Sequence, residues 1–265
     1  MPDADSRLSA DARWSARYPS LRDKRVLITG GGSGIGEFIV EAFAGQGARV
    51  AFIDIQADPS QALLARLAPS PHAVRFIHQD LTDIEGTQAA IARLCGDWGG
   101  MDILVNNAAN DDRHRVADIT REYWDARLAV NLRHYFFCAQ SVLPSMKAAG
   151  KGVVVNIGSI SWHLALPEIA VYQAAKAGIE GLTRALARDL GGDGIRVTCV
   201  VPGGVRTPRQ VALWHDQAEE ARMVAQQCLK DRVLPQDVAA MTLFLASDDA
   251  RLCTGHNYFV DAGWR

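Results

Sequence analysis

The sequence has no strong excess of either charge and no long apolar run. Lysine and arginine number 28 against 30 aspartates and glutamates, a formal net charge of −2 at pH 7. This balance lacks the positive field that attracts nucleic acid, so we expect no nucleic-acid partner. The longest apolar runs, such as 152–155 and 197–201, are strand-sized. None approaches the roughly 20 residues of a membrane-spanning helix, so we expect no membrane segment.

Cysteine is scarce and irregularly spaced. The five cysteines include no Cys-x-x-Cys pair, and scattered thiols in odd number suit a reducing compartment better than a disulfide framework. The first residues, Met-Pro-Asp-Ala-Asp, lack the apolar stretch of a secretory signal. Together these features predict a cytoplasmic protein. The seven histidines show no metal-ligand spacing, so we predict no metal site.

What the sequence does contain is an alternation of strand-like and helix-like segments. Runs rich in β-branched residues predict strands at 25–29, 49–54, 74–78, 103–105, 152–157, 195–201 and 257–260. Alanine-rich stretches predict helices at 35–46, 61–67, 84–95, 121–149, 170–190 and 237–246. The alternation is typical of an α/β fold, here a doubly wound, seven-stranded parallel sheet with helices on both faces. No repeat or linker interrupts it, so we predict a single domain over 23–265.

Two segments depart from this rhythm. Residues 1–22 are polar and aperiodic, and we predict an N-terminal arm that Trp14 and Tyr18 anchor on the body. Residues 203–230 form a long excursion between the sixth strand and the last helix, with a polar helical stretch at 217–227. Such an excursion predicts either a lid over a ligand or a surface helical hairpin.

A glycine-rich turn joins the first strand to the first helix. It reads Thr-Gly-Gly-Gly-Ser-Gly-Ile-Gly from Thr29 to Gly36. Glycine permits the tight turn and lets backbone amides approach a pyrophosphate, and the helix N-terminus favours that anion. The strand before and the helix after strengthen the prediction of a dinucleotide site. Its predicted cofactor-binding residues in this turn are Gly30, Ser33, Gly34, Ile35 and Gly36.

Polar residues end the next three strands. Asp54 follows Gly30 by 24 residues and can accept hydrogen bonds from adenosine ribose hydroxyls while repelling a 2′-phosphate. We therefore predict NAD as the cofactor, although a solvated strand-end aspartate is the simpler interpretation of Asp54 alone. Asp80 and Leu81 are predicted to meet the adenine. Asn107 and Ala108 are predicted to leave room for the cofactor at the carboxyl end of the sheet.

Four residues form a candidate catalytic set. Tyr172 and Lys176 are four residues apart in a predicted helix and therefore share a face. An ammonium beside a phenol stabilises the phenolate, which predicts a lowered pKa for Tyr172 and a general acid or base. Ser159 follows the fifth strand, 13 residues before Tyr172, where it can hold a reacting oxygen. Asn131 lies within the predicted 121–149 helix.

In the order and spacing of these motifs, the chain resembles the short-chain dehydrogenase/reductase family over 24–265, which implies a Rossmann-like fold. The resemblance implies that Tyr172 exchanges the proton and that Lys176 holds the nicotinamide ribose. It implies that Ser159 orients the substrate oxygen and that Asn131 supports a water-linked proton path. It also assigns cofactor contacts to Pro202, Gly203, Val205 and Thr207. Ala109 stands where the family usually has glycine.

Four segments, 106–114, 158–164, 253–256 and 261–265, resemble bacterial NAD-dependent aldose 1-dehydrogenases of the D-xylose type. This implies oxidation of the C1 hydroxyl of a sugar to a lactone. Several polar groups suit a polyol, because unpaired buried polar groups would reject an apolar competitor. Trp162 or Trp214 can lie against the sugar, or Trp162 can belong to the core. The predicted substrate residues are Asn110, Ser159, Ser161, His163, Tyr172, Gln173 and Gly203.

Other functions remain open at the level of sequence. Galactose, arabinose and fucose differ little from xylose. Another NAD-dependent oxidoreductase of the family, such as a 3-oxoacyl reductase, is a second hypothesis. A non-catalytic NAD-binding regulator is a third, since a fold does not fix a function. The family commonly forms dimers and tetramers, which predicts a homo-oligomer, although alanines 174, 175 and 177 can equally pack within one subunit.

Overall fold

Runs of β-branched residues form the sheet in the computed structural model, which describes residues 14–70 and 72–264. All strands run parallel, and their order is β3-β2-β1-β4-β5-β6-β7. The strands are β1 (Arg25–Thr29), β2 (Arg49–Asp54), β3 (Arg75–His78), β4 (Ile103–Asn106), β5 (Gly152–Ile157), β6 (Ile195–Pro202) and β7 (Asn257–Val260). The order reverses between β1 and β4, and a crevice at their carboxyl ends is the usual ligand site of such a sheet. The predicted single-domain, doubly wound α/β fold is confirmed.

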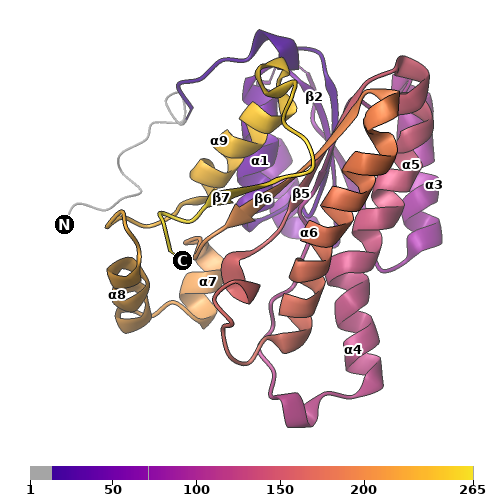
Figure 1. Cartoon of the computed structure of the whole chain (residues 1–265). Coiled ribbons are helices and arrows are strands. Elements are labelled where there is room, and N and C mark those ends of the chain that lie inside the picture. Colours follow the sequence, from indigo (N-terminus) through magenta and orange to yellow (C-terminus); the bar gives the residue numbers. More distant parts are fainter. Residues whose placement is uncertain (1–13, 71, 265) are drawn as a thin grey trace.

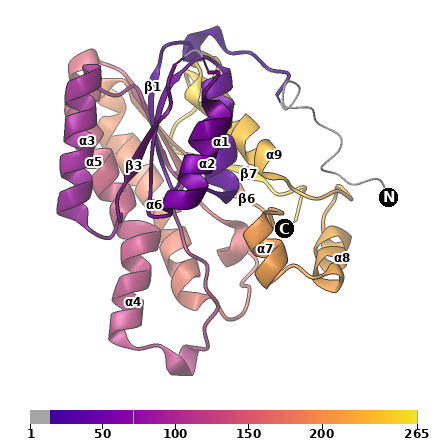
Figure 2. The same ribbon diagram turned by 180° about the vertical axis from the view of Figure 1, so that it is seen from behind.

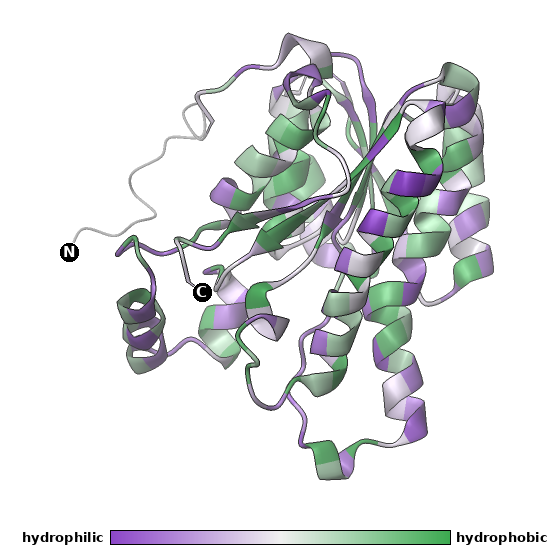
Figure 3. Ribbon diagram, viewed as in Figure 1, coloured by the Kyte–Doolittle hydropathy of each residue, from purple (hydrophilic) through white to green (hydrophobic). Residues whose placement is uncertain are grey.

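Helices cover both faces of the sheet (Figure 1). α1 and α9 pack on one face with α2 beside α1, while α3, α5 and α6 cover the other (Figure 2). The helices are α1 (Gly34–Gly45), α2 (Ala57–Leu67), α3 (Ile84–Trp98), α4 (Arg121–Leu128), α5 (His134–Ala149), α6 (Ala170–Leu190), α7 (Pro208–Leu213), α8 (Gln217–Gln226) and α9 (Pro235–Ala246). Their ribbons carry both apolar and polar residues, as amphipathic helices do (Figure 3).

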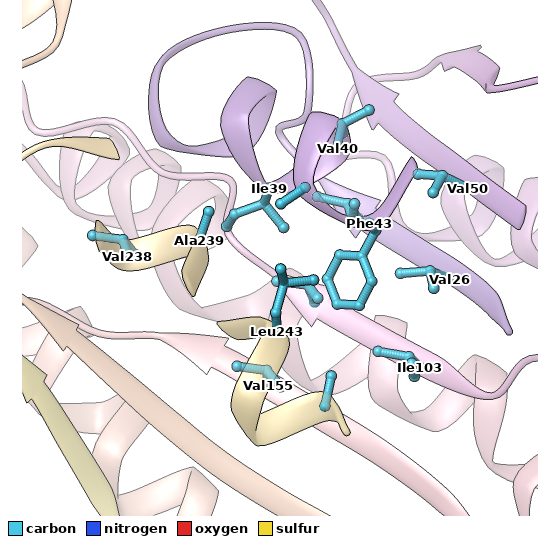
Figure 4. Packing of buried hydrophobic residues seen from close by; sticks show 14 of the residues in the cluster. Val26, Ile39, Val40, Phe43, Val50, Ile103, Val155, Val238, Ala239 and Leu243 are labelled. Carbon is cyan, nitrogen blue, oxygen red and sulfur yellow. The ribbon is translucent and has the colours of Figure 1, made fainter. Parts of the chain in front are cut away.

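The core beneath α1 and α9 fixes the glycine-rich turn in space. Phe43 of α1 and Leu243 of α9 lie together over Val26 and Val50 of the sheet (Figure 4). All four side chains are buried. Full burial of a side chain such as Phe43 stabilises the fold by roughly 1.5–3 kcal/mol. This packing holds α1 rigidly, so the helix start at Gly34 has one position relative to the strand ends.

The bounds of two predicted helices, 121–149 and 61–67, differ most from the structure. The predicted 121–149 helix is divided by a π-helical turn, η5 (Ala129–Arg133), between α4 and α5. α2 begins at Ala57 rather than at 61, because its first turn accommodates Pro59, which needs no backbone donor there. The hydroxyl of Ser60 in that turn donates to the Gln56 carbonyl at 2.6 Å.

The described part of the N-terminal arm, from Trp14 on, contacts the body of the domain. The indole nitrogen of Trp14 donates to the Gln236 carbonyl at 3.2 Å, and Tyr18 contacts the core under α1. Residues 1–13 of the predicted arm lie outside the described residues. Within 14–70 and 72–264, every helix is too short or too polar to cross a lipid bilayer.

Candidate active site

The glycine-rich turn depends on backbone conformations and contacts that only glycine allows at two positions. Gly30 has φ +67°, in the left-handed region that favours glycine. A Cβ at Gly36 would lie 1.8 Å from the Gly30 carbonyl oxygen, so that position admits no side chain. The chain therefore turns tightly into α1. The first N–H groups of this helix face the carboxyl edge of the sheet.

A cavity of about 700 Å³ opens at this edge, and its lining fits a dinucleotide. Gly34 (φ +59°) lines it, and a Cβ added there would meet only Thr207 Cγ2, at 3.8 Å. Within the described residues, the Ser33 side chain makes no capping hydrogen bond to α1. The start of α1 thus offers backbone donors to an anion in a space that glycine keeps open.

Asp54 forms the far wall of this cavity. Its carboxylate accepts hydrogen bonds from the backbone N–H of Gly32 at 2.8 Å and of Gln56 at 2.9 Å. Asp54 is buried in the protein alone. These two bonds fix the carboxylate between the glycine turn and the end of β2, where a ribose can reach its remaining acceptor positions.

The end of β4 is tied to the end of β1. The Thr29 hydroxyl accepts from the backbone N–H groups of Asn107 and Ala108, and the Asn107 side chain donates to the Thr29 and Gly30 carbonyls. His134 is fully buried behind this turn, 3.1 Å from the Ala108 carbonyl. Burial lowers the pKa of His134 to about 4, so it is a neutral structural group at pH 7.

Three members of the predicted catalytic set line the same cavity, namely Ser159, Tyr172 and Lys176. The Lys176 ammonium is buried and donates to the Ile157 carbonyl at 2.8 Å and to the Tyr135 hydroxyl at 3.3 Å. It lies 5.5 Å from the centroid of the Tyr172 ring. The Ser159 hydroxyl donates to Ser161 Oγ at 3.0 Å and accepts from Ser161 N. Serine, tyrosine and lysine thus meet at one wall.

The protonation of this group differs from the sequence prediction. We expected Lys176 to lower the pKa of Tyr172, but burial and the nearby Asp111 carboxylate raise it, and only the Ser159 hydroxyl opposes them. Burial also lowers the pKa of Lys176 to about 8. Burial is the largest cause of both shifts, and the ammonium donates to Ile157 and Tyr135 rather than to the phenol oxygen. In the protein alone, Tyr172 is therefore a neutral phenol at pH 7.

Asn131, the fourth member, lies behind the cavity wall instead of lining it. It sits fully buried in the π-helical turn. Its side chain accepts from the Asn110 N–H at 2.8 Å and donates to the Asn110 carbonyl at 3.0 Å. Both bonds hold the loop that follows β4. Such π-helical turns often occur at functional sites, and this one aims an amide that a continuous helix would carry elsewhere.

The predicted cofactor residues, apart from Gly36, line the cavity. They are Gly30, Ser33, Gly34, Ile35, Asp54, Asp80, Leu81, Asn107, Ala108, Tyr172, Lys176, Pro202, Gly203, Val205 and Thr207. Gly36 lies against the Gly30 carbonyl, where it shapes the turn. The Thr207 hydroxyl accepts from the Gln210 N–H as the N-cap of α7.

Two predicted substrate residues are placed elsewhere. Asn110 and Ser161 line the cavity, whereas His163 and Gln173 are absent from its lining. His163 Nε2 lies 2.9 Å from Glu180 Oε1, because this buried carboxylate attracts the ring away from the cavity. The Gln173 amide donates to the carbonyls of Ser161 and Leu166, which fastens the loop before α6.

The two tryptophans proposed as sugar contacts also lie outside the cavity lining. The Trp162 indole nitrogen donates to Glu180 at 2.8 Å, and the Trp214 ring stacks under the Arg113 guanidinium. Sequence reasoning missed another aromatic residue, Trp264, which lines the cavity and is buried. Its indole nitrogen donates to Gln226 Oε1 at 2.8 Å. The C-terminal segment carries part of the family resemblance, but no periodicity or spacing in it assigns Trp264 to the site.

Asp111, Arg113, Gln210 and His215 also line the cavity and were not predicted. They come from the loop after β4 and from the 203–230 segment. The position of Asp111, directly after Asn106–Asn110 at a strand end, was a usable signal. Nothing in the sequence indicated that Gln210 and His215 line the cavity, because their placement depends on how α7 folds back over the sheet edge.

Comparison with known proteins agrees with this geometry. The family described as Enoyl-(Acyl carrier protein) reductase matches residues 30–265. D-xylose 1-dehydrogenase of Caulobacter vibrioides is 58% identical over 251 residues, covering 95% of this chain and 99% of that protein. A probable galactose dehydrogenase of Rhizobium meliloti is 48% identical, covering 94% of this chain and 98% of that protein.

Solved structures share the architecture. Ligand-free aldohexose dehydrogenase of Thermoplasma acidophilum superposes with a TM-score of 0.82 at 26% identity, covering 93% of this chain and 96% of that chain. The structure named gox2181 reaches a TM-score of 0.87 at 32% identity, covering 93% and 98%. With a family match over 30–265 and relatives aligned over nearly their full length, the chain belongs to the short-chain dehydrogenase/reductase family.

Proposed function

We propose that this chain oxidises the C1 hydroxyl of an aldose, D-xylose first among the candidates, to the lactone with NAD. The observation that carries the proposal is the joint presence of Tyr172, Lys176 and Ser159 on one wall of the cavity. Relatives named D-xylose 1-dehydrogenase and galactose dehydrogenase support a sugar as substrate. Family membership implies a nicotinamide cofactor, and the choice of NAD is part of the proposal.

Each catalytic residue has a distinct task in this proposal. Ser159 Oγ donates to the C1 oxygen and orients it. Tyr172 Oη accepts the proton of the C1 hydroxyl, so that an alkoxide can collapse to a carbonyl as the C1–H bond breaks. When bound, the nicotinamide accepts the hydride. Lys176 holds the nicotinamide ribose, and Asn131 supports the proton path through the Asn110 loop.

Cofactor choice rests on Asp54. Its negative charge, fixed by two backbone hydrogen bonds, attracts ribose hydroxyls and repels a 2′-phosphate. The start of α1 would hold the pyrophosphate, as its uncapped N–H groups require an acceptor. Asp80, Leu81, Asn107 and Ala108 would border the adenosine half, and Pro202, Gly203, Val205 and Thr207 the nicotinamide half.

Further features complete the proposal. Residues 23–265 act as one catalytic domain, and 203–230, with α7 and α8, act as a lid, since Gln210, His215 and Met223 of that segment line the cavity. Asn110, Ser161 and Gly203 are proposed sugar neighbours. We also propose a cytoplasmic homo-oligomer, a dimer or tetramer, by analogy with the family.

The test is a panel of substrates with NAD and with NADP, followed by NADH or NADPH absorbance. The panel holds D-xylose, L-arabinose, D-galactose, D-fucose and a 3-oxoacyl thioester for the reverse direction. We expect turnover of an aldose with NAD and none of the thioester. Thioester reduction alone would favour the reductase, and cofactor binding without turnover of any compound would favour the regulator. Either outcome contradicts the proposal.

A further inference from the structure

Asp111 is a charged residue on the wall of the cavity that the proposed chemistry leaves without a role. It follows Asn110 directly, and Asn131 holds both backbone polar groups of Asn110. The loop is thereby fixed at the residue before Asp111. The position of this carboxylate is consequently built into the site and does not depend on a free surface loop.

The contacts of Asp111 differ from those of its neighbour Asp112. Asp112 pairs with two guanidinium groups, Arg209 at 2.6 Å and Arg127 at 3.1 Å, and it does not line the cavity. Asp111 accepts from the neutral Gln210 amide at 2.6 Å, while its nearest Arg209 nitrogen is 3.5 Å away. Asp111 thus has one close hydrogen bond and one longer ion pair, whereas both oxygens of Asp112 are paired closely with arginines. A carboxylate has about four acceptor positions, so Asp111 can accept further hydrogen bonds.

Asp111 also acts on the catalytic groups. Burial is the largest cause of the raised pKa of Tyr172, and the charge of Asp111 adds to it; the same charge partly opposes the burial that lowers the pKa of Lys176. Asp111 and Tyr172 both line the cavity, so the carboxylate and the phenol border the same space. A substrate whose reacting oxygen lies at Tyr172 would therefore bring its other substituents within reach of Asp111.

We propose that Asp111 is a specificity-determining residue that accepts a hydrogen bond from a substrate hydroxyl remote from the reacting carbon. The inference rests on the proposed sugar oxidation and adds the group that selects a polyol. A substrate that lacks this hydroxyl would displace water from the Asp111 carboxylate without replacing its hydrogen bond. The site would therefore reject such a substrate. Gln210, on α7 of the proposed lid, bonds the same carboxylate and couples lid position to the occupied site.

The experiment compares Asp111→Asn with the matched control Asp112→Asn. For each variant, kcat/KM is measured with the preferred aldose and with its deoxy analogues, and Kd is measured for NADH. We expect Asp111→Asn to lower kcat/KM for the aldose by about 10- to 100-fold, as for a lost hydrogen bond to a charged group. One deoxy analogue lacks the hydroxyl that bonds Asp111. For that analogue, Asp111→Asn should lower kcat/KM by less than about 3-fold. The Kd for NADH of Asp111→Asn should stay near that of the unaltered chain. Both kcat/KM and the Kd for NADH of Asp112→Asn should also stay near those of the unaltered chain.

A second readout is the pH profile of oxidation. Asp111→Asn removes a negative charge that raises the pKa of Tyr172, so the rising limb of kcat/KM should move to lower pH. Asp112→Asn should leave it in place. Other titratable groups near Tyr172 are common to both variants: Lys176 on α6, Tyr135 on α5, His114 in the β4–α4 loop, and His215 and Glu219 in the 203–230 segment.

The outcomes separate this inference from the proposed function. If the unaltered chain oxidises an aldose but the two variants have equal effects, the role of Asp111 is overturned and the proposed function stands. The same holds if Asp111→Asn causes the same loss for every deoxy analogue. Absence of aldose turnover by the unaltered chain overturns both. An isosteric variant that binds NADH normally rules out misfolding as the cause of a loss.

Discussion

The Lys176 ammonium lies 5.5 Å from the centroid of the Tyr172 ring, but its shortest hydrogen bond, 2.8 Å, goes to the Ile157 carbonyl. The cation therefore lies beside the phenol ring but is held by the end of β5. Buried tyrosine and lysine both favour their neutral forms here, as their pKa directions show. In the proposed oxidation Tyr172 accepts a proton, so the proposal requires the neutral phenol to lose its proton before turnover.

Replacement of Tyr172 by phenylalanine tests the proton carrier. The ring and its packing remain, so Tyr172→Phe should bind NADH with a Kd within about twofold of the unaltered chain. Turnover should fall by about 10²–10⁴-fold, the usual contribution of a positioned acid or base. Fluorescence titration and initial rates of aldose oxidation measure the two quantities. Retention of most of the turnover would show that another group moves the proton.

Removal of the Asp54 carboxylate tests cofactor choice. Asp54→Asn keeps the shape but loses the charge that repels a 2′-phosphate, so the ratio of kcat/KM for NAD over NADP should fall by about tenfold or more. Initial rates with both cofactors give the ratio. Asp58→Asn, a change nearby at the start of α2, serves as the control. An unchanged ratio in Asp54→Asn would contradict the assignment of NAD to this carboxylate.

The buried lysine makes stability depend on pH in a narrow window. Burial lowers the pKa of Lys176 to about 8, below the usual value near 10.5. Between these values the unfolded state holds a proton that the folded state has released, so unfolding free energy rises with pH. Tyr172 and Tyr135, whose pKa values are raised, act oppositely only above about pH 10.

Urea denaturation at pH 8.0 and 9.5 measures this linkage against Lys176→Met. The difference in unfolding free energy between the unaltered chain and the variant should shift by about 1.5 kcal/mol in favour of the unaltered chain at the higher pH. The methionine variant removes this group alone, so contributions from other residues cancel. A constant difference across the window would mean that Lys176 titrates normally.

Glu180 is predicted to position the turn that carries Ser159. Its buried carboxylate accepts from the Trp162 indole and from His163, and it also bonds the Asn257 amide. Glu180→Ala leaves these groups without an acceptor, so unfolding free energy should fall by about 3 kcal/mol and kcat should fall while NADH still binds. Glu180→Gln should restore part of both. Asp189→Asn, on the exposed face of the same helix, should change neither quantity in calorimetry or rate assays.

Much of the framework was predictable because strand and helix periodicity are local properties. The strands ended within about one residue of the predicted bounds, since β-branched runs and glycines determine them locally. The set Ser159, Tyr172 and Lys176 was also predictable, because helical spacing and strand ends bring it to one edge. The π-helical turn was not, because the hydrogen bonds of Asn131 to Asn110 depend on a loop distant from the helix in the sequence. The position of His163 was not predictable for a similar reason. Its partner Glu180 lies on α6, and the spacing of the two residues in the sequence does not indicate that they meet.

The π-helical turn makes the site sensitive to the number of residues between α4 and α5. Each residue removed from an ordinary helix rotates the downstream part of that helix by about 100° and shortens the helix by about 1.5 Å. A one-residue deletion within Ala129–Arg133 would allow a regular helix and keep the composition almost unchanged. It would nevertheless move the amide of Asn131 away from the backbone of Asn110, so the site requires this number of residues as well as the asparagine itself.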